Sequence, residues 1–492
     1  MKSLKNISLS ALLGLTLLSS CEKLKDFGDT NVNPNATTKP NTAALLTNVL
    51  AGVAGRANSA NPGYYCQYFA ETQYPTVSLY SLPQFDFDGI YAGAMYDCQN
   101  IIKTATEDPA AASVNGSVKN QIAIATILKA YYYWTVTDAW GDIPYSEALT
   151  ISNIFPKYDS QEAVYKGLLS ELTAIVDQFE TSGATVKGDI AYAGDVTKWR
   201  KLANSLRVLM AGRLNKKYPN AGDYAAVQLN AALAHSAGVI ESNADNFKIT
   251  YPGGNFMHPW YAAYNGRDDQ GESLFFVQLL TSLGDRRQTD RIFGSSDNGV
   301  PYGRDRATFM NNWFASNSTT YSKVLGDNFR QANSTSYIVH AASVWLARAE
   351  ARERGWTSES TAEALYTNGI TASYTQWGIP ASAVATYMAN PLVAYGGENL
   401  TKIATQRYIA SYPDGLQGWA EWRRTGVPTL TPALDAGNVT KAIPRRYVYG
   451  VNDYSTNRTN VLAAAGLIPV PVPTPAGAVA GDTQDGRVWW DR

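Results

Sequence analysis

The sequence predicts one large, mostly α-helical domain with a loop-rich block near its middle, and three observations support this prediction. Apolar residues recur at helical spacing over much of the first half of the chain and again after residue 337. Several of these helical patterns occur in pairs joined by short turns, at roughly the spacing of a tetratricopeptide unit. Between them, residues 240–335 are rich in Gly, Asn, Ser and Asp, a composition typical of loops with short strands.

The first twenty residues are predicted to be a signal peptide, not part of the fold. Lys2 and Lys5 give a positive start, and the apolar run ISLSALLGLTLL is too short to span a membrane as a mature helix. The run ends in LSSC at residues 18–21, which resembles the bacterial lipobox, where the cysteine is lipidated and becomes the first mature residue. Several acyl chains, at about 0.8 kcal/mol per buried methylene, would hold Cys21 to a membrane. The alternative is a plain secretory cleavage site beside an unrelated cysteine.

A polar tether, residues 21–40, is expected to join the lipid to a single domain over 41–492. The helical patterns before the loop-rich block lie at 42–56, 63–72, 88–106, 119–139, 160–180, 197–217 and 223–236. Those after it lie at 337–354, 360–377, 399–412 and 416–423. The last seventy residues are predicted to be loop-like, because IPVPVPTPAGAVAG is too rich in Pro and Gly for a helix.

The pair of patterns within residues 338–377 is the clearest helix–turn–helix unit. VHAASVWLARAEARERGW is followed by a break at Thr357 and Ser358, and then by TAEALYTNGITASYTQWGI. Such units bury their apolar faces against neighbouring units, so several must stack to form a stable array.

The aromatic stretch AYYYWTVTDAW, residues 130–140, is predicted to lie inside this array. Tyr131 and Trp134 continue an apolar stripe at helical spacing, and a second apolar stripe runs beside it. A helix that is apolar nearly all round is an interior helix. Gly141 is expected to end it and Pro144 to fix the exit of the chain. These rings are therefore assigned to the core and not to a ligand.

Composition and motifs argue against several classes of function. The net charge is −1 and no basic run occurs, so binding to nucleic acid by counterion release is not predicted. The three His are far apart, and HExxH, GxSxG, P-loop and GxGxxG patterns are missing, so no metal, cofactor or catalytic residue is predicted. A carboxylate pair for glycoside hydrolysis leaves no local signature. Cys66 and Cys98 fit either a disulfide or two reduced, buried thiols.

Three arginine-rich stretches are interpreted as structural. GDRRQTDRIFG (284–294), AEWRRTG (420–426) and IPRRYVYG (443–450) each place an Arg pair beside aromatic or acidic residues. Arginines in such settings usually pack over aromatic faces or bridge loops. The alternative is an anion site with bidentate contacts.

Aromatic residues without helical period mark the predicted ligand-binding loops. They lie in ETQYPTVSLYSLPQFDFDGIYAG (71–93), in YPGGNFMHPWYAAYNGRDDQ (251–270) and in NNWFASN (311–317). Sugars stack their C–H faces on such rings while Asn, Asp and Arg take the hydroxyl groups. The alternative is that these rings only anchor loops onto helices. The candidate ligand-binding residues are Tyr74, Tyr80, Phe85, Trp260, Tyr261 and Trp313.

Six motifs in this order carry a family resemblance that spans essentially the whole mature chain. They are the lipobox at Cys21, TDAWGDIPYSEAL (137–149), KWRKLANSLRVLMAGRL (198–214), GLQGWAEWRRTGVP (415–428), IPRRYVYGVNDYSTNRTNV (443–461) and RVWWD (487–491). Together they resemble the SusD/RagB family, and more narrowly its SusD-like lipoprotein branch from Bacteroidetes.

The resemblance implies a fold and a function. The expected fold has four tetratricopeptide-like helix pairs in a right-handed superhelical array, beside an irregular loop-rich half that binds the ligand and contains short strands. The expected protein is an outer-membrane lipoprotein facing the cell exterior. It captures oligosaccharides or other nutrients and passes them, without chemistry, to a SusC-like TonB-dependent transporter. A surface glycoside hydrolase or lyase, and an adhesive lipoprotein with protein partners, are the alternatives.

Overall fold

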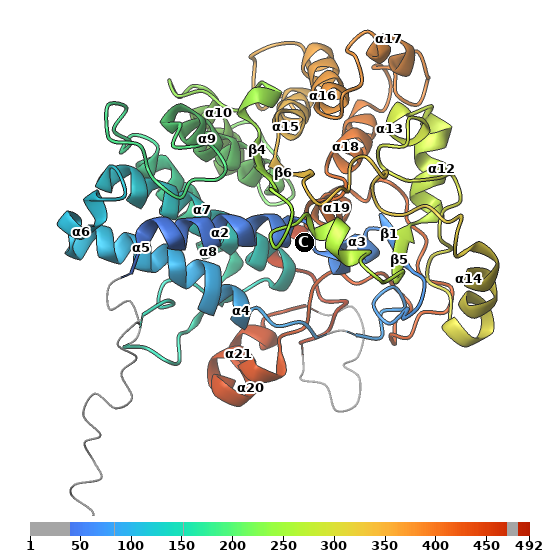
Figure 1. Ribbon diagram of the computed structural model, residues 1–492, viewed down its shortest axis with the longest axis horizontal. Coiled ribbons are helices and arrows are strands. Elements are labelled where there is room, and N and C mark those ends of the chain that lie inside the picture. Colours follow the sequence, from blue (N-terminus) through green and yellow to red (C-terminus); the bar gives the residue numbers. More distant parts are fainter. Residues whose placement is uncertain (1–39, 83, 151, 470–480) are drawn as a thin grey trace, which may run out of the picture. The chain divides into compact units, whose positions relative to one another are not determined.

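The computed structural model describes residues 40–82, 84–150, 152–469 and 481–492. Residues Thr42–Arg492 form one compact unit. The predicted signal peptide, the lipidation site at Cys21 and the tether up to residue 39 lie outside the described residues. Within the unit, helices predominate and only a few short strands accompany them (Figure 1). The predicted mostly helical fold class is therefore confirmed, whereas the tetratricopeptide-like geometry stays a prediction.

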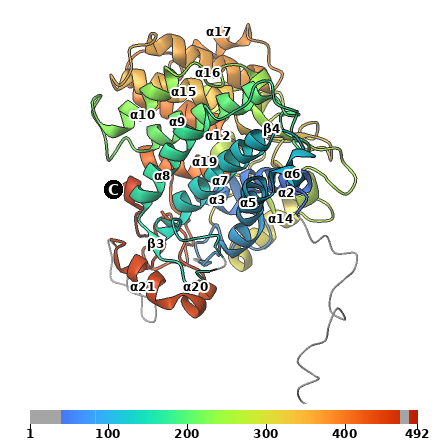
Figure 2. The ribbon, with the colours of Figure 1, turned by 90° about the vertical axis from the view of Figure 1, so that its left-hand side faces the viewer.

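The longer helices of the first half pack against one another in chain order. Neighbouring pairs are α5 with α7, α7 with α8, α8 with α9, and α9 with α10 (Figure 2). Their starts are encoded locally, since Ser117, Ser160 and Asp195 each accept backbone N–H groups of the first helical turn. These helices are α2 (Thr42–Ala57), α5 (Tyr96–Glu107), α7 (Val118–Trp140), α8 (Gln161–Ile175), α9 (Val196–Arg213) and α10 (Tyr224–Leu233).

A second group of helices continues the stack. Helix α15 packs against α16, α18 and also α9, so it joins the two groups, and α18 packs against α19. His340 and Asp414 accept backbone N–H groups at the starts of α15 and α19. The helices of this group are α15 (Ala341–Glu353), α16 (Ala362–Gln376), α18 (Asn399–Ala410) and α19 (Gly415–Thr425).

The strands of the described residues form two-stranded antiparallel sheets that connect distant parts of the chain. The pairs are β1 (Phe69–Glu71) with β5 (Gln270–Glu272), β2 (Ile143–Pro144) with β3 (Tyr158–Asp159), and β4 (Phe247–Thr250) with β6 (Thr335–Val339). Strands this short gain little stability from their own pairing, so the surrounding side chains must hold them in place.

Short helices complete the described unit. They are α3 (Ala60–Tyr65), α4 (Asp88–Ile90), η2 (Tyr91–Met95), α6 (Pro109–Ser113), η3 (Asn243–Asp245), α11 (Pro259–Ala263), α12 (Leu274–Leu283), α13 (Arg286–Thr289), η4 (Arg306–Met310), α14 (Asn311–Asn317), α17 (Ala383–Met388), α20 (Val451–Thr456), α21 (Arg458–Gly466) and η5 (Trp489–Asp491).

The predicted interior position of the aromatic helix is confirmed. Every residue of α7 from Ala130 to Trp140 is buried. The indole N–H of Trp134 donates to the hydroxyl of Tyr165 at 2.9 Å, and the hydroxyl of Tyr132 donates to the carbonyl of Val49 at 2.9 Å. Among the described helices, none is both long and apolar enough to cross a membrane.

The structural interpretation of the arginine stretches is also confirmed. Arg287, Arg423, Arg424 and Arg446 are all buried. Arg424 belongs to a larger group in which arginines and carboxylates from five helices meet in the interior. This group, the buried ion-pair cluster, consists of Asp138, Arg213, Glu350, Arg407, Glu421 and Arg424.

The structure corrects three secondary-structure predictions. The helix predicted over 63–72 ends at Tyr65, because Gln67 adopts a left-handed conformation with φ of 59° and strand β1 follows. Helix α12 forms inside the block predicted as loops. Ser273 caps its start, and Gly284, at φ of 66°, ends it. Helices α20 and α21 form in the C-terminal region that was also expected to be loops.

The two cysteines of the described unit are free. Cys66 and Cys98 are both fully buried, and no disulfide joins them. Burial raises the pKa of each thiol, which keeps both protonated at neutral pH. Of the two states that the sequence left open, the structure has the reduced one, in which each cysteine packs as a small apolar side chain.

Candidate functional site

The short sheet β1–β5 brings two of the predicted ligand-binding loops together. Its antiparallel register places Glu71, at the end of β1, opposite Gln270, at the start of β5. The loop that leaves β1 and the loop that enters β5 therefore emerge at the same end of the sheet. The backbone N–H of Thr72 donates to the carbonyl of Asp269 at 2.8 Å, and the Thr72 hydroxyl donates to the carbonyl of Asp268.

The third aromatic segment joins them through residues 321–323, which follow it in the chain. The backbone N–H of Glu272 donates to the carbonyl of Ser322 at 2.8 Å, and the hydroxyl of Ser322 donates to Oε2 of Glu272 at 2.7 Å. The Tyr321 hydroxyl donates to the Asp268 carboxylate at 3.1 Å, and the ammonium of Lys323 pairs with that carboxylate at 3.0 Å. Residues 72–82, 261–269 and 302–323 meet at one surface, which we call the loop edge.

Tyr74 gives the loop edge its most exposed ring. Its side chain is 56% exposed, and the guanidinium of Arg306 lies over its ring, 4.9 Å from the centroid. Arg306 begins η4 and is itself exposed. Nearby, Arg304 lies over the ring of Phe309 at 3.9 Å and pairs with Asp435 at 3.0 Å, which holds η4 in place. A ring with one solvent-facing side and an adjacent hydrogen-bond donor suits a sugar.

Trp313 and its neighbour Phe314 form the outer part of the loop edge. Both are half-buried on α14, and their rings lie 6.5 Å and 5.9 Å from the ring of Tyr321. Tyr321 is buried with Ala70 of β1 and Met310 of η4 in a small apolar cluster. Trp313 and Phe314 pack against this cluster, which fastens α14 to β1.

Trp260 and Tyr261 are adjacent in sequence but have different environments. Tyr261 is 40% exposed, whereas Trp260 is 2% exposed and packs against Phe69 of β1 with ring centroids 4.8 Å apart. His258 begins their short helix α11, where its Nδ1 accepts the N–H of Trp260 at 3.2 Å. Trp260 therefore anchors the loop and offers no ring face to a ligand in this structure, while Tyr261 does.

Tyr80 and Phe85 are also directed inward. Tyr80 is 1% exposed, and its hydroxyl accepts the backbone N–H of Ala433 at 2.9 Å. Phe85 is half-buried with its ring 4.3 Å from that of Tyr447, and its carbonyl accepts the indole N–H of Trp140 at 3.0 Å. Both residues fasten the loop that carries Tyr74 to the C-terminal region.

Two buried carboxyl groups support the loop edge from below. Burial raises the pKa of Glu71 to about 7, although the N–H and hydroxyl of Ser78 both donate to its Oε2, at 2.7 and 2.6 Å. Burial likewise raises the pKa of Glu272 to about 8, with Ser322 as a donor. Neither carboxyl is paired with a cation among the described ion pairs. Each holds a loop segment in place and neither faces the open surface.

The loop edge combines exposed aromatic rings with polar side chains. Its exposed rings, Tyr74 and Tyr261, lie among side chains that donate and accept hydrogen bonds, including Arg306, Arg267 and Asp268. This combination of aromatic faces with a few polar groups is typical of ligand sites. In the described part of the chain, no three His, Cys, Asp or Glu side chains lie close enough to hold a metal ion.

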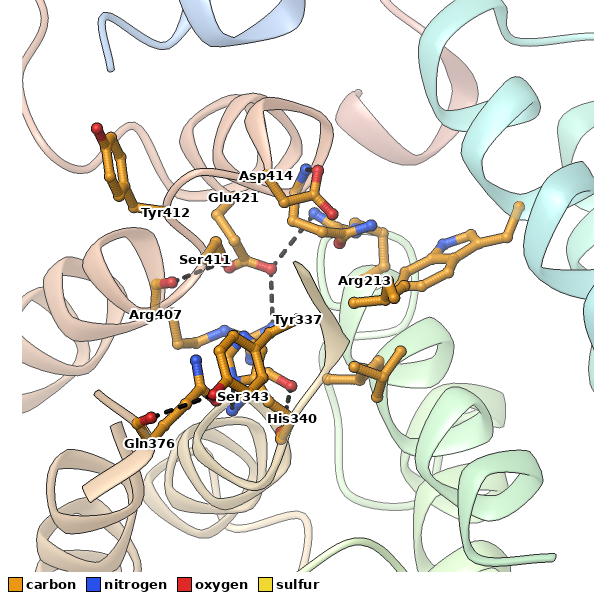
Figure 3. Close-up of a pocket in the computed structure, with 15 residues that line it drawn as sticks. Arg213, Tyr337, His340, Ser343, Gln376, Arg407, Ser411, Tyr412, Asp414 and Glu421 are labelled. Carbon is orange, nitrogen blue, oxygen red and sulfur yellow. Dashed lines mark hydrogen bonds and ion pairs between the residues drawn. The ribbon is translucent and has the colours of Figure 1, made fainter. Parts of the chain in front are cut away.

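A hollow lies in the interior and is too small for a sugar. It is enclosed between β6, α15, α18 and α19, and Arg213, Asp414 and Glu421 line it (Figure 3). Its volume of ≈ 30 Å³ has room for only one or a few water molecules, since a cavity needs about 10–15 Å³ to hold one. Oδ2 of Asp414 has no hydrogen-bond partner among the described residues, and burial raises the pKa of this carboxyl to about 7. The hollow belongs to the packed core.

Sequence reasoning did not identify the polar residues of the loop edge. Arg306, Asp268 and Lys323 contact predicted rings or their neighbours, but none was a candidate. A local signal does exist, since NGRDDQ (265–270) and GRDRATF (303–309) place Arg and Asp beside aromatic residues in the loop-rich block. What the sequence lacks is the long-range pairing of β1 with β5 that brings these stretches together.

Comparison with known proteins gives a family and a fold. A family model described as "Starch-binding associating with outer membrane" matches residues 34–450. A solved chitin-binding protein is 27% identical with a TM-score of 0.75, covering 92% of this chain and 100% of its own. A SusD homologue from Bacteroides uniformis is 24% identical with a TM-score of 0.75, covering 92% and 99% of the two chains. A chitin-binding SusD homologue from Flavobacterium johnsoniae is 23% identical with a TM-score of 0.74, covering 92% and 98%.

Among curated protein sequences, the comparison finds no match. The family match nevertheless spans most of the chain, and the solved SusD homologues share its fold over nearly their whole length. SusD-like proteins are binding proteins and not catalysts. The chain belongs to the SusD-like family of starch-binding proteins that associate with the outer membrane.

Proposed function

We propose that this protein is a lipoprotein, anchored through Cys21 to the outer membrane and facing the cell exterior, that captures oligosaccharides at the loop edge. It then passes them to a SusC-like TonB-dependent transporter without chemistry. Residues 1–20 are the signal peptide, 21–40 are the tether, and 41–492 are the binding domain, with the loop-rich block at about 240–335 supplying much of the site.

The observation that carries this proposal is the convergence of three aromatic loops. They are far apart in the sequence, and each contributes to one exposed surface beside β1 and β5. Tyr74, Tyr261 and Trp313 are the ligand-stacking residues, with Arg306 and Asp268 as hydrogen-bonding partners for hydroxyl groups. Tyr80, Phe85 and Trp260 hold the loops that carry them.

The comparisons support the class of ligand. The family is described as starch-binding, and a protein 27% identical over nearly its whole length is named as chitin-binding. Both polymers are chains of glucose-type pyranose units with flat C–H faces, which exposed tyrosine and tryptophan rings are suited to stack against. Malto-oligosaccharides and chito-oligosaccharides are therefore the first ligands to test.

Calorimetric titration tests the site. Tyr74→Ala and Trp313→Ala are each expected to weaken binding of the oligosaccharide that the wild type binds by about tenfold, which corresponds to ~1.4 kcal/mol. Phe155→Ala is a matched control, because Phe155 is 57% exposed, similar to Tyr74 at 56%, but lies on the loop before β3. If Tyr74→Ala and Trp313→Ala both bind as tightly as the control, the ligand lies elsewhere.

Two alternative functions, a surface glycoside hydrolase or lyase and an adhesive lipoprotein, are distinguished from this proposal by the products formed and the partners bound. Chromatography of the oligosaccharide after long incubation should show no shorter products; turnover that disappears with one carboxylate variant contradicts a binding role. Affinity purification from native outer membranes should recover a TonB-dependent transporter. Recovery of adhesion partners without a transporter favours an adhesive lipoprotein instead.

A further inference from the structure

A second pocket lies on another part of the unit. Its volume is ≈ 280 Å³, and it opens between α4, η2, the segment around Pro144 and α20. Helix α20 lies well apart from α14 and the loop edge in both views (Figures 1 and 2). We call it the acid–aromatic pocket, after the lining residues Phe87, Asp88, Tyr91, Tyr96, Tyr158 and Asp453.

Three of the four rings that line this pocket are held in fixed orientations. Phe87 packs edge-on against the buried Trp140 at 5.4 Å and lies 5.2 Å from Tyr91. The hydroxyl of Tyr91 donates to the carbonyl of Pro144 at 2.5 Å. Tyr158 packs edge-on against Tyr449, with centroids 5.4 Å apart. The aromatic lining is therefore preformed, so a ligand pays little to order it.

The two carboxylates of the pocket have hydrogen bonds but no cation. Asp453 is 6% exposed and accepts the Tyr158 hydroxyl at 2.6 Å and the N–H of Gly450 at 2.9 Å. Asp88 accepts the side-chain amide of Asn452 at 3.0 Å. Neither carboxylate takes part in any ion pair of the described residues. Burial raises the pKa of Asp453 to about 6, and repulsion from Asp88 and Asp482 adds to this effect.

The neighbourhood supplies no basic side chain to this pocket. Among the described residues that line it, none is Lys, Arg or His. The nearby Lys157 follows Pro156 of the lining, but it pairs with Glu147 at 3.6 Å and Asp159 at 3.7 Å. The field inside the pocket is therefore negative, and it is focused by the low-dielectric walls.

The aromatic faces of the pocket also lack a covering cation, in contrast to other rings of the unit. Elsewhere in the unit, arginines cover aromatic rings closely, as Arg423 does over Trp419 at 3.8 Å and Arg348 over Trp345 at 3.9 Å. In the described part of the chain, no Lys or Arg lies over any of the four rings that line the pocket. Negative ring faces beside unpaired carboxylates form the chemical setting that recognises an organic ammonium group.

We propose that the acid–aromatic pocket binds a ligand that carries an ammonium group and has the size of one sugar ring, namely an amino sugar with an unacetylated amine. The ammonium group pairs with Asp88 and Asp453, while the pyranose face stacks on the exposed sides of Tyr91, Tyr96 and Tyr158. The pocket volume of ≈ 280 Å³ leaves room for a single pyranose ring. This site is separate from the loop edge and does not depend on it.

Titration with glucosamine at pH 7 tests the proposal, with binding measured by calorimetry and by tryptophan fluorescence. Fluorescence is a suitable signal because Trp140 packs against Phe87, which lines the pocket. Glucosamine is expected to bind at least tenfold more tightly than glucose or N-acetylglucosamine, which lack the cation. Raising the salt concentration from 50 to 500 mM should weaken the binding severalfold, because the attraction is ionic.

Variants identify the pocket. Asp88→Asn and Tyr96→Ala, both at partly exposed positions, should each reduce glucosamine affinity about tenfold, and Asp453→Asn should do the same if its melting temperature is unchanged. Val227→Ala, at an exposed position of α10 outside both sites, should leave glucosamine binding unaltered. Equal affinity for glucose and glucosamine, or wild-type affinity in both Asp88→Asn and Tyr96→Ala, overturns the proposal. Tighter binding of putrescine or choline than of glucosamine overturns the assignment to an amino sugar.

Discussion

The buried ion-pair cluster and the loop edge both combine arginines with aromatic rings, yet the two regions do opposite jobs. In the cluster, Arg213 is 2% exposed and lies 5.6 Å from the rings of both Trp134 and Trp490. At the loop edge, Arg306 lies 4.9 Å from the ring of Tyr74, and both side chains face solvent. Residue type alone therefore does not separate structure from binding; access to solvent does.

The cluster balances its charges internally. Glu350 of α15 accepts from Arg407 of α18 at 2.8 Å and from Arg424 of α19 at 2.5 and 2.7 Å. Glu421 accepts from the same two arginines at 2.8 and 2.6 Å. Removing these groups from water costs several kcal/mol per ion, which the mutual attraction offsets only while every partner is present. The cluster therefore fixes the relative positions of the helices that support the loops.

The loop edge lacks this mutual pairing. Arg267 and Asp268 are partly exposed, and their interactions with Asp269 and Lys323 are open to water. Exposed ion pairs contribute only about 0–1 kcal/mol to stability. Side chains at this edge can therefore exchange partners with a ligand at low cost. The comparison predicts large losses of stability from changes in the cluster and losses of binding alone from changes at the edge.

Removing a carboxylate from the cluster should have the largest effect. Glu350→Ala leaves Arg407 and Arg424 buried with one carboxylate fewer, and we expect unfolding free energy to fall by ~3–5 kcal/mol. Urea denaturation followed by circular dichroism measures this change. Glu162→Ala is the control, because its pair with Lys166 is exposed and should contribute about 0.5 kcal/mol or less. A loss below 1 kcal/mol for Glu350→Ala would show that the cluster does not hold the helices.

Truncating an aromatic residue of α7 should have a similar effect on stability. Trp134→Ala removes a ring that is 1% exposed and bonded to Tyr165, and it is expected to cost ~3–5 kcal/mol. Thermal unfolding measures the loss, and calorimetric titration of the surviving folded protein should show unchanged oligosaccharide affinity. A variant that keeps its stability but loses affinity would move this ring from the core to the ligand site.

Acid should weaken the cluster in a defined pH range. Burial alone would raise the pKa of Glu421, but Arg407 and Arg424 outweigh it and lower the pKa to about 2, below the ordinary value of 4.5. A depressed folded-state pKa stabilises the protein above pH 4.5, and this contribution is lost as pH falls toward 2. The carboxyls of Asp414 and Glu272, whose pKa values are raised, have the opposite dependence.

Comparing the wild type with Glu421→Gln isolates the cluster from those opposing groups. The difference in unfolding free energy between the two proteins should be largest at pH 6–7 and shrink steadily below pH 4.5. Urea denaturation at a series of pH values gives both curves. A difference that stays constant down to pH 3 contradicts the depressed pKa of Glu421.

Changes to the exposed rings should have the smallest effect on stability. Tyr74→Ala and Tyr261→Ala remove side chains that are 56% and 40% exposed, so the unfolding free energy should change by about 0.5 kcal/mol or less. Trp260→Ala, one position away from Tyr261, is the matched comparison and should cost ~3–5 kcal/mol. Equal losses for Trp260→Ala and Tyr261→Ala would contradict the division of α11 into an anchor and a ligand-facing ring.

Periodicity predicted the long helices and the interior position of α7, because a helix of more than twenty residues displays its burial pattern many times. The structural interpretation of Arg423 and Arg424 rests instead on the tendency of arginines to pack over aromatic faces or bridge loops. Periodicity missed α12, whose apolar run lies in a block that is polar on average, although Ser273 and Gly284 mark its ends. It also missed α20 and α21, which follow the structural motif IPRRYVYG.

Within the candidate site, sequence reasoning predicted the segments but not the orientation of each residue. Trp260 and Tyr261 are neighbours in a five-residue helix, which is too short to show a period. Which of them is buried depends on Phe69, nearly two hundred positions away in the chain. Tyr80 is buried for a similar reason, since its partner Ala433 lies in the C-terminal part of the chain. Arg306 was missed because only long-range folding places it over Tyr74.

A crystal structure of the protein soaked with the oligosaccharide that it binds tests the central claim most directly. We expect a sugar ring stacked on the exposed face of Tyr74, within reach of Arg306 and beside α14. We also expect the rings of Tyr131 and Trp134 in α7 to remain free of ligand contacts. An oligosaccharide seated elsewhere on the unit, with Tyr74, Tyr261 and Trp313 all solvent-exposed, would contradict the assignment of the loop edge.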